Sequence, residues 1–204
     1  VPSAAAGIIV GVVGYSGIGL KFSSLIIEAS SGYLLLALVL IMVGCIIMGM
    51  GMPTSGAYIM GAVLMAPALQ RMGVPGMAAH MFILYFSALS MITPPVALAS
   101  YVAAGISEAG ITQTGWKAFQ LSLAAFLVPF AFIFNPAIVL QGSLEQIAVT
   151  TLSLFAGIVA LAGAIIQHFL RRNRTWETVL LWLAAVLLIT PETVTSIIGL
   201  ACLG

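Results

Sequence analysis

Long apolar stretches joined by short polar connections make up most of the chain. They cover residues 4–20, 33–50, 53–70, 77–92, 96–107, 116–140, 147–170 and 176–203. A helix needs about 20 residues, at about 1.5 Å each, to cross a hydrocarbon core of about 30 Å. Only the last three stretches reach that length comfortably, so the pattern predicts full membrane spans together with shorter or broken helices.

Residues 33–70 are too long for a single crossing, because a straight helix of that length would extend about 57 Å. The sequence GMGMPTSGAY, Gly49–Tyr58, interrupts them with three glycines and a proline. Glycine and proline are the residues that most readily break a helix. We therefore predict a helical hairpin over 33–70 that turns within Gly49–Gly56.

A second interruption, SMITPPVALAS, lies within the apolar residues 77–107. Pro94 and Pro95 have no amide donors, and a residue before proline, here Thr93, is disfavoured in helical dihedrals. Unpaired backbone costs several kcal/mol in hydrocarbon, so it persists only where protein or water surrounds it. Two successive breaks favour one shared binding site, although ordinary proline kinks in scaffold helices are the simpler alternative.

The two breaks offer hydroxyls and backbone groups of the kind that hold a small cation and an anionic substrate. The predicted substrate- and ion-binding residues are Gly49, Gly51, Met52, Thr54, Ser55, Ser90, Ile92 and Thr93, with Pro53, Pro94 and Pro95 as the helix breakers. A sodium ion would be held by Thr54, Ser55, Ser90 and Thr93. For proton coupling, the candidate relay residues are His80 and Glu108, for which capping and solvated-surface roles are the alternatives.

Composition narrows the class of protein. Of the 204 residues 62% are hydrophobic and 5% are charged, against roughly 25% charged residues in soluble domains. This composition predicts a multi-pass membrane protein and leaves too few charges for a nucleic-acid surface. Cys45 and Cys202 lie in apolar stretches and are interpreted as packing residues.

Other function classes fit less well. The chain has no HExxH-type metal set or nucleophile with its base inside a span, so an intramembrane enzyme is not indicated. An ion channel or a structural membrane subunit without a site of its own is the alternative to a transporter. No cofactor is expected apart from a bound sodium ion.

The polar connections suggest an orientation. The basic cluster Arg171–Arg174 predicts a cytoplasmic loop, and residues 21–31 predict either an amphipathic helix in the membrane interface or a plain loop. The chain begins without methionine or a charged leader, so we interpret it as a fragment of a longer protein or a processed piece.

The sequences GMGMPTSGAYIMGAVLMAP, MGVPGMAAHMF, ALSMITPPVALASYVAAGI and LVPFAFIFNP carry a family resemblance. Residues 1–142 resemble the C-terminal half of the large (M-type, DctM-like) membrane subunit of tripartite ATP-independent periplasmic (TRAP) transporters. The sequence of these motifs is most similar to that of fused permeases that work with TAXI-type binding proteins. The final pair of spans resembles the extra C-terminal helices of those fused chains.

This resemblance implies an all-helical elevator transporter of the ion-transporter superfamily, of which one inverted repeat is present. By this analogy 1–32 is a scaffold helix with an interfacial arm, and 33–109 is the transport domain, with a re-entrant hairpin at 33–70 and its tip at Met52–Gly56. Residues 77–107 are then the broken helix, 110–142 a closing transmembrane helix, and 143–204 a C-terminal helix pair.

The implied function is import of small organic acids by Na⁺ or H⁺ symport across a bacterial or archaeal inner membrane. Implied partners are a periplasmic substrate-binding protein, a small membrane subunit or its fused equivalent, and the N-terminal half of the same permease. Many family members have an aspartate where this chain has Pro53, and an asparagine and a glycine where it has Phe86 and Ser90. Both coupling ions therefore stay open.

Overall fold

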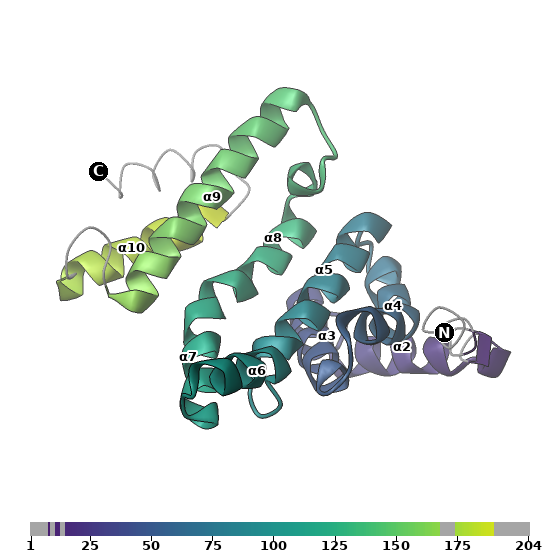
Figure 1. The fold of residues 1–204 in the computed structure, drawn as a ribbon. Coiled ribbons are helices and arrows are strands. Elements are labelled where there is room, and N and C mark those ends of the chain that lie inside the picture. Colours follow the sequence, from purple (N-terminus) through teal and green to yellow (C-terminus); the bar gives the residue numbers. More distant parts are fainter. Residues whose placement is uncertain (1–7, 9–10, 13–14, 168–173, 190–204) are drawn as a thin grey trace. The chain divides into compact units, whose positions relative to one another are not determined.

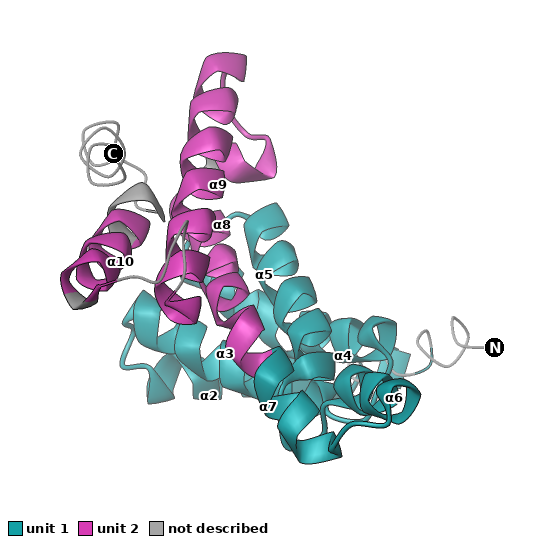
Figure 2. Cartoon of the chain, turned by 60° about the vertical axis from the view of Figure 1, so that its left-hand side comes forward, with its two compact units in different colours: residues 1–118 teal, residues 119–204 magenta. Residues whose placement is uncertain are grey.

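The computed structural model describes residues 8, 11–12, 15–167 and 174–189. These residues form helices and connecting turns, and no β-strand occurs among them, as Figure 1 shows. The all-helical prediction is confirmed for this part of the chain. The chain separates into two compact units, residues 1–118 and 119–204, which are coloured separately in Figure 2.

The first unit holds both predicted breaks. Its helices are α2 (Ile18–Ala29), α3 (Leu34–Gly49), α4 (Thr54–Arg71), α5 (Gly76–Leu89), the 3₁₀ turn η1 (Ser90–Ile92), α6 (Leu98–Ser107) and most of α7 (Ile111–Ser122). The second unit contains η2 (Leu123–Leu127), α8 (Val128–Phe134), η3 (Pro136–Val139), α9 (Leu144–Ile166) and α10 (Thr175–Ile189).

Helix α4 forms the packing centre of the first unit, because α2, α3 and α5 all lie against it. Small residues allow this close approach. A Cβ added to Gly61 would lie 2.8 Å from Ile83 Cγ2 of α5, which is closer than real Cβ atoms are found. Helices α3 and α4 therefore form the predicted helical hairpin, and α5 packs on both of them.

Helix α2 confirms the helical alternative for residues 21–31, and the loop alternative is wrong. It begins earlier than predicted, at Ile18, because Gly17 in front of it has a φ of 66°, a left-handed value that ends any continuous helix from the preceding residues. Ser23 is fully buried and donates to Leu64 O of α4 at 3.3 Å and to Gly19 O at 2.8 Å. Residues 4–7, 9–10 and 13–14 of the predicted span 4–20 lie outside the described residues.

The predicted helix 116–140 is corrected by the structure. The chain is helical from Ile111, passes through the 3₁₀ segment η2 and ends its α-helical course at Phe134. Pro129 and the pair Asn135–Pro136 account for the interruption, since proline removes a helical hydrogen bond and disfavours helix in the residue before it. Asn135 is extended, with φ −134° and ψ 98°.

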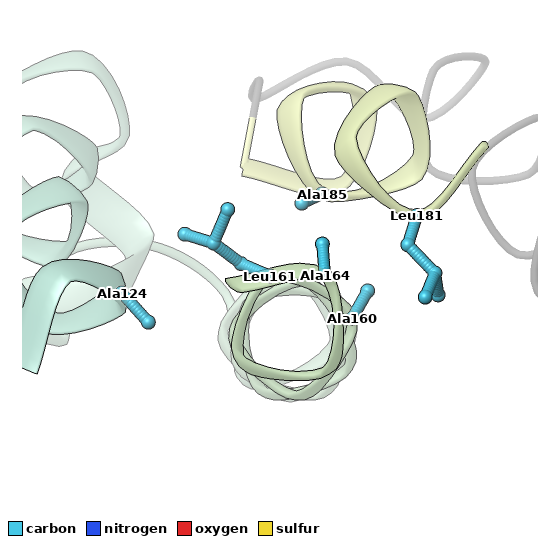
Figure 3. Packing of buried hydrophobic residues seen from close by; sticks show 6 residues of the cluster. All are labelled: Ala124, Ala160, Leu161, Ala164, Leu181 and Ala185. Carbon is cyan, nitrogen blue, oxygen red and sulfur yellow. The ribbon is translucent and has the colours of Figure 1, made fainter. Parts of the chain in front are cut away.

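The second unit is organised around α9 and α10. Helix α9 begins at Leu144 because Ser143 and Gln146 form a reciprocal capping box, with Gln146 N donating to Ser143 Oγ at 3.3 Å. Figure 3 shows the buried contact between these helices, made by Ala160, Leu161 and Ala164 of α9 with Leu181 and Ala185 of α10, with Ala124 of η2 nearby. Residues 168–173 and 190–204 lie outside the described residues, and with them Cys202 and all of the basic cluster except Arg174.

Candidate functional site: two adjoining helix breaks

The first break is the turn between α3 and α4. Gly49 is the last residue of α3, and Met52 N donates back to Gly49 O at 3.3 Å. Gly51 has a φ of 79°, which an L side chain rarely adopts, so glycine is required in this turn. Pro53 then sits at the N-cap of α4, where its missing amide costs nothing.

This turn is shorter than predicted. The predicted tip ran from Met52 to Gly56, but Thr54, Ser55 and Gly56 already form the first turn of α4, so only Met50–Pro53 lies outside the helices. A proline just before the first helical residue fixes a φ that suits helix entry, which explains why the helix begins directly after it. The first amides of α4 thus face the break.

The second break follows η1. Thr93 is extended, with φ −96° and ψ 122°, as expected for a residue before proline. Ala97 has φ −72° and ψ 70°, and Leu98 N donates to Val96 O at 2.9 Å, which together make an inverse γ-turn. Helix α6 begins immediately after this turn. The interruption predicted at Thr93–Pro95 is therefore present.

The two breaks adjoin one another at Gly49 and Ser90. A Cβ built on Gly49 would lie 2.7 Å from Ser90 Cβ, nearer still to Ser90 Oγ, and 3.5 Å from Ala57 Cβ of α4. Gly49 and Ser90 are both buried. The end of α3, the start of α4 and the start of the second break therefore meet at one point.

The hydroxyls of the second break are directed by their own backbone. Ser90 Oγ donates to Ser87 O and Thr93 Oγ1 donates to Leu89 O, each at 2.7 Å, and both side chains are buried. A hydroxyl that donates in this way keeps its oxygen lone pairs. Ser90 and Thr93 can therefore still act as oxygen ligands to a cation.

The other predicted site residues are less buried than Gly49, Ser90 and Thr93. Gly51 and Ser55 are exposed, and Met52, Thr54 and Ile92 are half-buried. Among the described residues no hydrogen bond joins Thr54 or Ser55 to Ser90 or Thr93. A sodium site drawn from all four hydroxyls therefore stays a prediction.

The two candidate proton carriers, His80 and Glu108, differ in burial and in the contacts they make. His80 is half-buried in α5, and its Nδ1 lies 3.1 Å from the hydroxyl of Tyr58 on α4, so the pair links the hairpin to the broken helix. Glu108 is exposed just past the end of α6, with a φ of 54°. His80 thus contacts the hairpin through Tyr58, whereas Glu108 lies at the end of α6 that is away from the break.

The binding residues predicted from the sequence end at Thr93, and two polar residues that follow the prolines were not among them. The hydroxyl of Tyr101 donates to Pro95 O and so ties the irregular segment to α6. Ser100 is buried in the first turn of α6. Their short spacing after the two prolines was the available signal, because a side chain early in α6 leans back toward the break.

Two of the described helical stretches, Ile111–Phe134 and Leu144–Ile166, are long and apolar enough to cross a membrane, and the first unit adds a helical hairpin and a broken helix. Residues 3–147 match the family described as Tripartite ATP-independent periplasmic transporter, DctM component. The chain belongs to this family. The resemblance inferred over residues 1–142 is confirmed, and the chain is a transporter permease component of the membrane, not a member of an enzyme family.

Residues 146–199 match a domain of unknown function (DUF3394), which covers α10 and all but the first two residues of α9. No curated protein and no solved structure matches the chain.

Proposed function

We propose that this chain forms part of a permease that imports small organic acids by cation symport. A periplasmic binding protein would deliver the carboxylate. A small membrane subunit and the N-terminal half of the permease would complete the transporter. The family description, a tripartite periplasmic transporter, supports these partners. The hairpin α3–α4 and the broken helix α5–α6 would move between the two membrane faces as one rigid unit, as in an elevator.

The observation that carries this proposal is the close approach of Gly49 to Ser90. Non-helical backbone is tolerated at membrane depth only where protein or water surrounds it, and each unsatisfied group there costs several kcal/mol. Two breaks that share a ligand must adjoin, and the packing of α3 against α5 and η1 brings these two together.

Charge at the breaks supports binding of both a cation and an anion. Helices α3 and α5 end at the site and present the negative ends of their dipoles, and Ser90 and Thr93 add hydroxyl oxygens. Helices α4 and α6 begin there and present positive ends with free amides. The cation would sit toward η1, and the carboxylate toward the starts of α4 and α6.

The coupling ion is sodium or a proton. Ser90 and Thr93 favour sodium, which prefers hard oxygen ligands, whereas the His80–Tyr58 contact supports a proton route between α4 and α5. A His80→Phe variant separates the two, because it removes the relay and leaves the hydroxyls in place.

The test is uptake into proteoliposomes that contain the complete permease and its binding protein. We expect saturable uptake of radiolabelled succinate, glutamate or acetate when an inward sodium gradient or pH gradient is imposed, and little without one. Ohmic current without saturable uptake would instead identify a channel, and neither signal would identify a structural subunit.

A further inference from the structure

We infer that Ser100, in the first turn of α6, is a direct hydrogen-bond donor to the carboxylate of the transported substrate. This inference rests on the proposed function and adds a binding residue that is not among the predicted site residues. Ser100 is 4% exposed, and its Oγ is the one buried side-chain nitrogen or oxygen in the described part of the chain that has no hydrogen-bond partner.

The missing partner is a consequence of the helix break. A buried serine in a helix usually donates to the carbonyl three or four residues earlier, as Ser87 does to Ile83 O at 2.8 Å and Ser90 does to Ser87 O at 2.7 Å. For Ser100 the fourth preceding carbonyl belongs to Val96, which the γ-turn directs to Leu98 N instead. Its hydroxyl therefore stays available.

The surroundings of Ser100 offer hydrogen-bond donors in preference to acceptors. The three carbonyls before α6 already accept hydrogen bonds, Pro95 O from the Tyr101 hydroxyl, Val96 O from Leu98 N and Ala97 O from Tyr101 N. The amides of Ala99 and Ser100 belong to the first helical turn, where N–H groups lack an intrahelical acceptor. Ala97 provides no side-chain cap for them.

Such a cluster of donors at the positive end of a helix favours an anion. A side chain in a helix leans toward the N-terminus, so the Ser100 hydroxyl is directed to the same end as the free amides. A buried hydroxyl without a partner is costly, and an anionic ligand removes that cost. Since the transported acid is the anion that the proposed function supplies, its carboxylate is the expected occupant.

The experiment compares Ser100→Ala with Ser107→Ala in the complete permease with its binding protein. Ser107 lies on the same helix but donates to Ala103 O at 2.9 Å at the far, exposed end, so its variant is the matched control. We expect Ser100→Ala to raise the KM for the best-transported of succinate, glutamate and acetate by about 10-fold or more, the usual range for a bond to a charged group. Ser107→Ala should not change it.

Two further measurements make the result specific. Thermal stability of Ser100→Ala should match the unsubstituted protein or exceed it, because the change removes an unpaired buried hydroxyl. The cation concentration for half-maximal uptake should stay the same. Ser100→Thr, which keeps the hydroxyl, should recover most of the lost affinity.

A KM for Ser100→Ala equal to that of the unsubstituted protein would overturn the inference and leave the hydroxyl to an ordered water. A changed cation dependence with an unchanged KM would also overturn it and make Ser100 a cation ligand. If the unsubstituted permease takes up none of the three acids, the proposed function itself fails, so the two failures are distinguishable.

Discussion

At the scale of single residues, Gly49 is the described glycine at which an added Cβ would approach its neighbours most closely. We predict that Gly49→Ala lowers the midpoint of thermal unfolding in detergent and impairs uptake, because its methyl group would overlap Ser90. Overpacking of this kind costs about 1–3 kcal/mol.

Gly56→Ala is the matched control, since an added Cβ there meets nothing within 4 Å and the residue is helical. Alanine in a helix is more stable than glycine by up to about 1 kcal/mol, so this variant should unfold at the same temperature or higher. Equal stability of the two variants would contradict the close approach of the two breaks.

Thr93 is the residue whose substitution should weaken cation binding most. Thr93→Ala removes a buried oxygen, and we expect the cation concentration for half-maximal uptake to rise about 10-fold, which corresponds to about 1.4 kcal/mol. Thr93→Ser keeps the oxygen and loses only a methyl group, so its cation dependence should lie much closer to that of the unsubstituted protein. An unchanged cation requirement in Thr93→Ala would remove this residue from the ion site.

At the scale of elements, the packing of α2 on α4 depends on small side chains. Ser23 is fully buried against α4, whereas Ser24 is exposed and donates only within its own helix, to Leu20 O at 3.0 Å. We predict that Ser23→Leu lowers thermal stability strongly and that Ser24→Leu changes it little, because only the first must displace α4. Similar unfolding temperatures for both variants would show that α2 does not pack here.

Element boundaries show what the sequence could and could not predict. The breaks at Pro53 and at Pro94–Pro95 followed from backbone chemistry, because proline acts on its own and the preceding residue whatever surrounds it. The early start of α2 was missed because apolarity does not encode the left-handed conformation of Gly17. The end of α8 at Phe134 was missed although Pro136 signals it by the same backbone chemistry.

The site was predictable in part for the same reason. Hydroxyl-bearing residues next to the prolines could be identified by position, but the meeting of Gly49 with Ser90 depends on how α3, α4 and α5 pack. The spacing of Ser100 after the two prolines was a weak signal, because serine in an apolar helix is common, and the missing hydrogen-bond partner that distinguishes it is visible only in the structure.

At the scale of the whole molecule, the described site residues all belong to the unit of residues 1–118. Changes confined to the α9–α10 contact should therefore leave substrate affinity alone. We predict that Ala160→Leu, at a fully buried position of that contact, lowers thermal stability, while the KM for uptake stays within about twofold.

Val159→Leu is the control for this variant, because Val159 is 39% exposed on the same helix and can accept an extra methylene. A large KM change in Ala160→Leu, with none in Val159→Leu, would show that the C-terminal pair takes part in substrate binding.

The most direct measurement is a cryo-EM map of the complete permease with bound substrate and coupling ion. Ligand density should lie between the Met50–Pro53 turn and the segment from Thr93 to Ser100, with α3 ending at Gly49. Continuous helices through Pro53 and Pro95, or a ligand bound away from both turns, would contradict the account.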